Sequence, residues 1–368
     1  MMASTNRTAL ITGGAGFVGS NLAERLLRDP DVHVRIFDNL SRRGVQHNLD
    51  WLQTLPGSSR LEIVRGDVRE ARAVRQAAKG VSEIYHLAAQ VAVTTSLDDP
   101  NSDFQTNAMG TFNVLEAART SGMRPFFLYT STNKVYGSLA RVPVEVEASQ
   151  FRARDSQFHG VNEEEQLDFH SPYGCSKGAA DQYVRDYARI FDLPTVVFRM
   201  SCIAGPRQFG NEDQGWVAHL LYSVLSGNPI TVYGTGYQVR DVLHVHDLVD
   251  AMIAVRSSIH RCQGEIYNLG GGMERVVSVL ELLGRIEKKT GKKPQVQFQQ
   301  GRPGDQPLYV SNTAKLERET GWKAARSLDR ILEDIHAFWQ DHREVISLHS
   351  AFTHTALDLE ALMTQEVS

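Results

Sequence analysis

The 368-residue chain has only three cysteines, Cys175, Cys202 and Cys262, and they lie far apart in the sequence. This spacing provides neither the pairs of a disulfide-stapled domain nor the close sets of four that bind zinc. No stretch approaches the ~20 consecutive apolar residues of a membrane-spanning helix. Residues 1–7 lack the charged and then apolar pattern of a signal peptide. We therefore expect a protein of the reducing cytoplasm, with no metal and no membrane partner.

Neither sign of charge dominates the chain. Lys and Arg together number 39 and Asp and Glu number 43, which gives a formal net charge of -4. A nucleic-acid-binding domain normally carries a marked positive excess, so no nucleic-acid partner is expected. The apolar fraction of 42% and the charged fraction of 22% are those of an ordinary globular protein. The length suits about two domains of ~150 residues.

Strand-like and helix-like segments alternate over the first 200 residues. Strands are expected at residues 8–12, 32–37, 61–64, 83–87, 125–130 and 195–198, and helices at 17–28, 101–121 and 172–191. Such alternation predicts an α/β protein with a Rossmann-type doubly wound parallel sheet.

The pattern loosens after residue 200 and predicts a smaller mixed α/β substrate domain. Short strands are expected there at 230–233, 266–268 and 295–298. We assign residues 1–200 to the Rossmann domain, with a returning segment at about 238–262, and residues 201–345 to the substrate domain. Residues 346–368 form a tail without a clear pattern and of unknown role.

A glycine-rich loop follows the first expected strand. Gly14, Gly16 and Gly19 satisfy G-x-G-x-x-G between a strand and a helix, and Asp38 ends the second strand 19 residues later. Glycines let a pyrophosphate reach the helix N-terminus, where the N–H groups and the helix dipole bind its charge. The Asp38 carboxylate can bind a ribose 2′-hydroxyl and would repel a 2′-phosphate. The expected cofactor is therefore NAD, although the arginines at 42–43 could favour NADP.

Tyr173 and Lys177 form a Y-x-x-x-K pair on the expected helix at 172–191. Residues four apart lie on one helix face, so the ammonium should lie near the phenol and lower its pKa from ~10. Tyr173 would then serve as a general base that takes the proton of a sugar hydroxyl while a hydride passes to nicotinamide. Cys175 lies between the two and should point away from that face.

Together with Val135-Tyr136-Gly137 and the N-x-x-G-T segment at 107–111, these motifs resemble the extended short-chain dehydrogenase/reductase family acting on nucleotide sugars. The resemblance covers roughly residues 7–340. It implies that Thr132 hydrogen-bonds the reacting hydroxyl. It also implies that Arg240, in GTGYQVRD, and Arg302, in RPGD, hold the substrate diphosphate, although each could instead pair with a neighbouring aspartate. Members often associate through NAD-domain helices, so a homodimer or homotetramer is expected.

Asn133 and Lys134 narrow this resemblance. The 4,6-dehydratases of the family carry Asp-Glu at these positions, and Asn133 cannot titrate to help remove water. Four longer strings, at 90–96, 131–137, 167–177 and 213–217, resemble the CDP-sugar 2-epimerases of the family, which interconvert CDP-paratose and CDP-tyvelose. That resemblance implies inversion of C2 by transient oxidation. A related epimerase acting on another CDP- or UDP-sugar, a net dehydrogenase or reductase, and a non-catalytic NAD-binding sensor remain as alternatives.

The candidate site residues fall into three groups. The catalytic group is Thr132, Tyr173 and Lys177. The candidate cofactor-binding residues are Gly13, Gly14, Gly16, Phe17, Val18, Gly19, Asp38, Asn39, Ser41, Arg42, Asp67, Val68, Leu87, Ala88, Ala89, Gln90, Asn107, Tyr173, Lys177 and Ser201. The candidate substrate-binding residues are Thr94, Thr132, Asn133, Gln208, Arg240 and Arg302. No metal site is assigned, because His244 and His246 stand without a nearby cysteine or acidic cluster and are expected to be structural.

Overall fold

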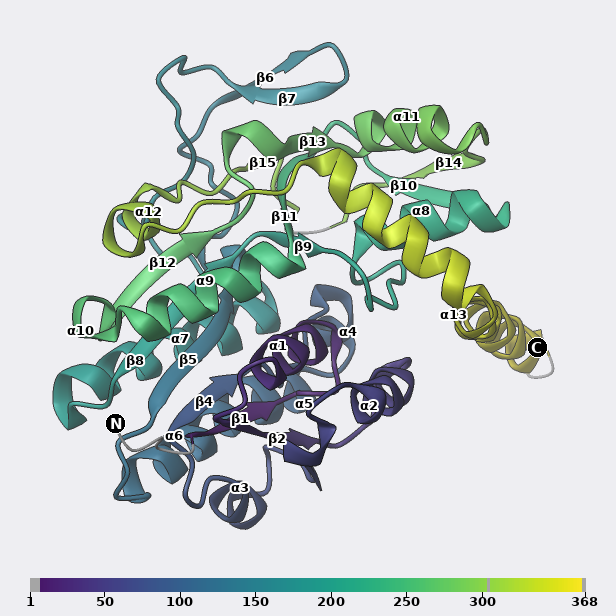
Figure 1. The fold of residues 1–368 in the computed structure, drawn as a ribbon. Helices are drawn as coiled ribbons and strands as arrows, with labels where there is room; N and C mark the ends of the chain where they lie inside the picture. Colours follow the sequence, from purple (N-terminus) through teal and green to yellow (C-terminus); the bar gives the residue numbers. More distant parts are fainter. Residues whose placement is uncertain (1–6, 303–304, 366–368) are drawn as a thin grey trace.

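The computed structural model describes residues 7–302 and 305–365, with side chains up to residue 346. Its main feature is a seven-stranded, all-parallel sheet with the order β12-β8-β5-β4-β1-β2-β3 (Figure 1). The strands are β1 (Arg7–Thr12), β2 (Val32–Asp38), β3 (Leu61–Arg65), β4 (Glu83–His86), β5 (Phe126–Thr132), β8 (Thr195–Met200) and β12 (Glu265–Leu269). The expected Rossmann-type sheet is therefore confirmed.

Helices cover both faces of this sheet, as its apolar strands require. On one face the buried core is shared with α1 (Phe17–Leu27), α2 (Val45–Thr54), α9 (Val245–Ser257), α10 (Ile259–Cys262) and α12 (Ala314–Thr320). On the other face it is shared with α3 (Ala71–Ala77), α6 (Gly110–Thr120) and α7 (Ser171–Phe191). The two apolar layers fix the sheet and leave its carboxyl edge free to carry polar loops.

The strand order reverses at β1, which pairs with β2 on one side and with β4 on the other. Thr12, the last residue of β1, therefore lies opposite both Phe37 and His86. The loops after these strands diverge to opposite faces of the sheet. A crevice at the carboxyl ends of the strands is the usual ligand site of such a fold.

The helix expected at 101–121 is present but is not regular. It consists of α5 (Pro100–Phe104), a π-helical turn at Gln105–Met109, and α6, and it follows the short helix α4 (Val93–Asp98). Asp99 caps its N-terminus by accepting a hydrogen bond from the backbone N–H of Ser102 at 2.9 Å. Such widened turns occur often at functional sites, and here the turn carries the buried residue Asn107.

The second region lies above the carboxyl edge of the main sheet (Figure 1). Its strands β9 (Cys202–Ala204), β13 (Val276–Ser278) and β15 (Leu308–Tyr309) all pair with β11 (Val239–His244), and β10 (Ile230–Tyr233) pairs with β14 (Val296–Gln299). A separate apolar core joins these strands, except β15, to α8 (Trp216–Ser226), α11 (Val279–Thr290) and the first part of α13 (Leu328–Gln365). The insertion before α7 carries the hairpin β6 (Val144–Glu147) and β7 (Gln150–Ala153). Single turns of 3-10 helix also lie at Ser58–Arg60, Asn133–Tyr136 and Met273–Arg275.

The segment of the second half that returns to the first domain has other bounds than the sequence predicted. The strand expected within the substrate domain at 266–268 is β12, which pairs with β8 and completes the main sheet. The residues at 239–244 form β11, which belongs to the second region. The chain thus returns to the first domain over 245–269 and not over 238–262, and it packs on the same sheet once more with α12. Periodicity identifies a strand but carries no information about its partner in space.

The tail also differs from its prediction. The helix α13 continues through the expected boundary at residue 346 as far as Gln365, with one non-helical residue at His342. Residues 366–368 lie outside the described part. Among the described residues, no helix combines the length and apolar character needed to cross a membrane.

Candidate active site

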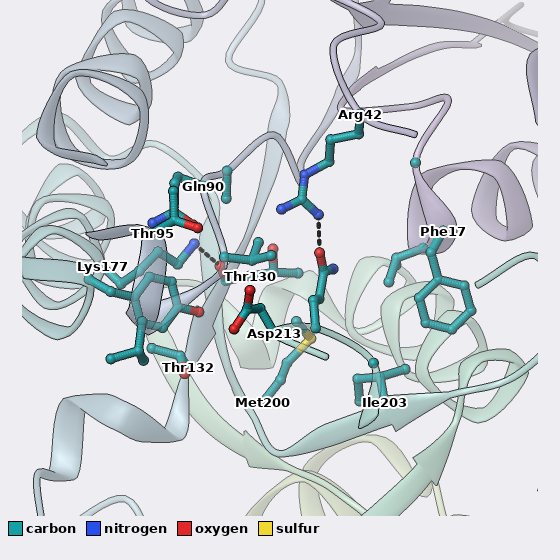
Figure 2. Close-up of a pocket in the computed structure, with 18 of the residues that line it drawn as sticks. Phe17, Arg42, Gln90, Thr95, Thr130, Thr132, Lys177, Met200, Ile203 and Asp213 are labelled. Atoms are coloured by element: carbon teal, nitrogen blue, oxygen red, sulfur yellow. Dashed lines mark hydrogen bonds between the residues drawn. The ribbon is translucent and has the colours of Figure 1, made fainter. Parts of the chain in front are cut away.

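A cavity of about 840 Å³ lies at the carboxyl edge of the main sheet, between the two regions (Figure 2). This volume lies in the upper part of the range that is usual for small-molecule sites. All six candidate substrate residues line it, and so do all candidate cofactor residues except Gly14 and Asn107. The fold therefore brings together residues that are up to 289 positions apart in the sequence, from Gly13 to Arg302.

The glycine loop is packed so closely that side chains are excluded. A Cβ on Gly13, whose φ is +70°, would lie 2.8 Å from the amide nitrogen of Ala88, and one on Gly19 would lie 2.4 Å from the carbonyl oxygen of Gly13. A Cβ on Gly14 would press on Ile36, so Gly14 serves packing behind the loop. The N-cap of α1, Gly16, has no side-chain cap. The N-terminus of α1 is therefore available to bind a phosphate.

Asp38 stands at the end of β2 with its carboxylate fixed by the backbone. Its two oxygens accept hydrogen bonds from the N–H of Ala15 at 3.1 Å and of Leu40 at 2.9 Å. Burial raises the pKa of Asp38, and these hydrogen bonds act in the opposite direction. Nearby, the Arg42 guanidinium hydrogen-bonds Gln214 across the cavity (Figure 2).

Tyr173 and Lys177 lie one turn apart at the start of α7, as the spacing predicted. The Tyr173 hydroxyl forms a hydrogen bond with Thr132, the last residue of β5. The Lys177 ammonium donates to the carbonyl oxygen of Thr130 at 2.6 Å and lies 4.3 Å from the centroid of the Tyr129 ring. Figure 2 shows Lys177, Thr130 and Thr132 gathered on one side of the cavity.

The sequence predicted that Lys177 lowers the pKa of Tyr173, and in this structure the pKa of Tyr173 is raised instead. Burial raises the pKa of Tyr173 above its usual value of 10, and the hydrogen bond with Thr132 only partly opposes this. Burial also lowers the pKa of Lys177 to about 7, against the charges of Asp181 and Asp103. Sequence spacing shows that two residues share a helix face but not how much water surrounds them.

Gln306 is a residue of the site that the sequence interpretation missed. It is completely buried, and it accepts a hydrogen bond from the Asn133 side-chain amide at 2.9 Å. Its own amide donates to the carbonyl oxygen of Gly137 at 2.6 Å. The carbonyl oxygen of the Asn133 side chain is thereby turned toward the Thr132 hydroxyl, 3.3 Å away. Gln306 lies 173 positions from Asn133 and belongs to no motif, so no local signal identifies it.

Arg240 lines the cavity with its guanidinium already engaged. It donates to the carbonyl oxygens of Val239 at 2.8 Å and Gln306 at 2.7 Å and pairs with Asp305 at 2.6 Å. The Lys134 ammonium lies 3.8 Å from Asp305. Burial and the charge of Arg240 lower the pKa of Lys134 to about 8, while Asp305 acts to raise it. Arg240 thus forms an ion pair and also lines the cavity, but its partner is Asp305 and not the adjacent Asp241.

Arg302 lies on the outer part of the cavity. Its guanidinium stacks 4.0 Å from the centroid of the Tyr233 ring and lies 3.5 Å from the carboxylates of Glu212 and Asp213. None of these three partners was among the sequence candidates, although all three line the cavity. The aromatic ring and the two carboxylates hold the planar guanidinium in place. It is still able to bind an anion.

Asn107 shapes the cavity wall from behind. Its side chain accepts a hydrogen bond from the backbone N–H of Gln90 at 2.9 Å and donates to the carbonyl oxygen of Gln90 at 3.0 Å. Both hydrogen bonds fix the loop after β4. Asn107 is therefore a supporting residue and not a lining one.

The two histidines of the H-x-H pair have protein partners. His244 lies 3.1 Å from Asp334 and caps α9, and His246 lies 3.2 Å from Asn21. Within the described residues, no group of three or more histidine, cysteine or acidic side chains is placed to hold a metal ion.

Comparison with known proteins gives consistent likenesses over most of the chain. Residues 10–335 match the family described as GDP-mannose 4,6 dehydratase. The chain is 42% identical over 320 residues to CDP-paratose 2-epimerase from Salmonella typhi, covering 85% of this chain and 93% of that protein. It is 31% identical over 338 residues to dTDP-glucose 4,6-dehydratase from Salmonella typhimurium, covering 87% and 89%. In structure it is similar to UDP-glucuronic acid 4-epimerase from Bacillus cereus, in complex with UDP-glucuronic acid and NAD, with a TM-score of 0.78, 26% identity, and coverage of 91% and 99%.

Proposed function

Because the chain belongs to the GDP-mannose 4,6 dehydratase family, we propose that it is a NAD-dependent nucleotide-sugar epimerase that converts CDP-paratose to CDP-tyvelose by inverting C2. One observation carries this proposal: Tyr173, Thr132 and Lys177 open into the same cavity as the glycine loop, with Asn133 beside them where a dehydratase needs a carboxylate. The 42% identity to CDP-paratose 2-epimerase supports the choice of sugar nucleotide.

The residues at the carboxyl edge of the sheet fit NAD. The glycine loop leaves room for a pyrophosphate at the start of α1, and Asp38 presents a carboxylate at the end of β2. Lys177 reaches the inner end of the same cavity, where it can donate hydrogen bonds to ribose hydroxyls. Bound NAD would supply transient acceptance and return of the C2 hydride together with a positively charged ring.

Tyr173 moves the proton of the reacting hydroxyl. It takes that proton as the C2 carbon is oxidised and returns it when the 2-keto sugar is reduced on the opposite face. Thr132 hydrogen-bonds the same oxygen, because a hydroxyl can donate to a ketone and accept from an alcohol. The burial that raises the pKa of Tyr173 also strengthens the effect of any positive charge placed beside it.

Dehydration does not fit these residues. Removal of water across two carbons needs an acid and a base in addition to Tyr173. Asn133 cannot titrate, and Gln306 holds its amide in one orientation. A related NDP-sugar epimerase of the CDP- or UDP-glucose type is the second candidate, because UDP-sugar epimerases are among the similar proteins. A net sugar-nucleotide dehydrogenase or reductase is the third.

The path of the hydrogen tests the proposal. CDP-paratose deuterated at C2 should give CDP-tyvelose that is still deuterated at C2, and turnover in deuterium oxide should place no label there. NMR of the product measures both, and CDP-glucose and UDP-glucose run in parallel test the second candidate. Solvent deuterium at C2 would refute the hydride mechanism, since a proton held on a side chain exchanges with water. A net change in NADH absorbance would instead favour a dehydrogenase.

Asp38 predicts a strong preference for NAD over NADP. The 2′-phosphate would meet a partly buried carboxylate whose backbone partners prevent it from moving away. We expect NADP to bind at least about a hundredfold more weakly, because close like charges cost several kcal/mol. Calorimetry on protein stripped of cofactor would give both dissociation constants. In Asp38→Asn the ratio should fall toward one, and equal affinities in the unchanged protein would shift the role to Arg42.

We also propose a cytoplasmic homodimer or homotetramer, paired through the helices of the first domain. Phe104, Met109, Phe112 and Ile190 expose between 37% and 66% of their surface on α5, the π turn, α6 and α7. Large apolar side chains gathered on neighbouring helices commonly mark an interface. Sedimentation should therefore show at least a dimer, and a monomer at micromolar concentration would contradict this arrangement.

A further inference from the structure

The segment between β9 and α8 brings two carboxylates to the outer part of the cavity. Glu212 and Asp213 lie at the tip of this segment, and both line the cavity. In Figure 2 the Asp213 carboxylate projects into the cavity. Negative charge is unexpected there, because the ligand proposed for this cavity carries a negatively charged diphosphate and like charges repel each other. We call residues 211–215 the acidic tip.

The acidic tip has a fixed shape and position. The side-chain carbonyl of Asn211 accepts hydrogen bonds from the backbone N–H of Asp213 at 3.1 Å and of Gln214 at 2.8 Å. The tip ends at Gly215, whose φ of +75° suits a glycine and which begins α8. Across the cavity, the Gln214 side chain accepts a hydrogen bond from the Arg42 guanidinium (Figure 2). These contacts keep the two carboxylates at the cavity wall.

The residues that precede the acidic tip are anchored to the first domain. The carbonyl oxygens of Pro206 and Arg207 accept hydrogen bonds from the side chains of Asn21 at 3.2 Å and Asn48 at 3.3 Å. The Arg207 guanidinium also stacks 3.4 Å from the centroid of the Trp51 ring on α2. The segment therefore belongs to the first domain at its start and reaches the second region with its tip.

The carboxylates of the acidic tip pair with Arg302. Glu212 and Asp213 each lie 3.5 Å from its guanidinium, and the Tyr233 hydroxyl donates a hydrogen bond to Glu212. The guanidinium itself is held 4.0 Å from the centroid of the Tyr233 ring. A guanidinium binds carboxylates and phosphates through the same N–H groups. A diphosphate that binds Arg302 must therefore compete with these two carboxylates.

We propose that Glu212 and Asp213 are internal competitors for Arg302 that set the affinity of the cavity for the diphosphate of its ligand. The proposal rests on the proposed function in one respect, since it assigns the cavity to a nucleoside diphosphate. An epimerase must release a product that carries the same diphosphate as its substrate. Two carboxylates that take the place of the diphosphate on Arg302 favour this release without any contact with the reacting carbon.

The direct test is the affinity for CDP of a variant with Glu212→Gln and Asp213→Asn, measured by calorimetry with NAD at saturation so that CDP does not occupy the glycine loop. The amides still accept hydrogen bonds but form no ion pair. Because both carboxylates are roughly half-exposed, the Kd should fall by about tenfold, as expected for two surface charge pairs.

A matched control removes the same number of charges elsewhere. Asp186→Asn together with Glu287→Gln alters two exposed carboxylates that lie outside the cavity wall. Because exposed charges beyond a Debye length are screened, the Kd for CDP should change by less than about twofold. An unchanged Kd in the variant of the acidic tip, or an equal gain in the control, would overturn the proposal.

Arg302→Met separates competition from simple repulsion. The substitution should weaken CDP binding by about tenfold, because a positively charged partner of the diphosphate is lost. In this background, Glu212→Gln with Asp213→Asn should tighten binding by only about twofold, since no ion pair has to be broken. If the tenfold gain persisted without Arg302, the carboxylates would act by repulsion alone and the proposal would be wrong.

UDP gives a test that does not depend on the choice of sugar nucleotide. Arg302 and the acidic tip act on the diphosphate, so UDP should show the same gain as CDP. A gain confined to one base, or no measurable binding of either nucleotide in any variant, would overturn the proposal. If the protein binds these nucleotides as expected but epimerises no sugar nucleotide, the proposed function fails while the role of the acidic tip stands.

Discussion

Tyr173→Phe should lower kcat by about a thousandfold, within the range that a positioned general acid or base contributes. The substitution removes one hydroxyl and almost no volume from a side chain that is 8% exposed. Phenylalanine can neither take the proton of the C2 hydroxyl nor return it. The hydrogen bond with Thr132 is also lost, but Thr132 still accepts from the backbone N–H of Lys134 at 3.2 Å.

The measurement is the initial rate of product formation by NMR, with NAD affinity by calorimetry. NAD affinity and the thermal midpoint should change little. Tyr183→Phe is the matched control, because it removes a hydroxyl from an exposed tyrosine on the same helix. If Tyr173→Phe retained more than a few per cent of kcat, another group would have to move the proton.

Arg199→Met should lower the free energy of unfolding by about 3–5 kcal/mol, the usual result of breaking a buried ion pair from one side. The Arg199 and Asp181 side chains are 3% and 1% exposed and share two hydrogen bonds of 2.9 Å. Arg199 also donates to the Tyr136 hydroxyl at 3.0 Å. Methionine fills much of the space but leaves the Asp181 carboxylate buried without the counter-charge that is hydrogen-bonded to it.

Urea denaturation at fixed protein and NAD concentrations would measure this loss. Arg28→Met is the control, since it breaks an exposed pair with Glu24 on α1 and should change stability by less than about 1 kcal/mol. A loss below about 1 kcal/mol in Arg199→Met would show that the Asp181 charge finds other compensation.

The features that depend on local sequence were predictable. The glycine loop and Asp38 could be proposed from the sequence because their pattern spans only about 25 residues, and Tyr173 and Lys177 because a helix fixes the geometry of positions four apart. The strand pattern of the first 200 residues was equally local. Each of these needed no knowledge of what packs against it.

The features that depend on packing could not be predicted. Gln306 reaches the site only through the fold: it directly follows the RPGD motif, but no sequence rule pairs it with Asn133, 173 positions away. The raised pKa of Tyr173 follows from burial, which a spacing rule does not contain. For the same reason, no local pattern indicated that the strand at 265–269 would leave the second region and pair with β8.

The late return of the chain to β12 means that the cofactor domain is not a continuous piece of polypeptide. A gene truncated after residue 200 would encode β8 without its outer neighbour and would lack α9 on one face of the sheet. Such a fragment would expose a flat, apolar edge strand, which tends to pair with other copies and aggregate. Exchange of substrate domains between relatives therefore cannot be done by joining two halves. It would require replacement of separate inserts on either side of 245–269, with the junctions kept and with α12, which also packs on the main sheet, retained.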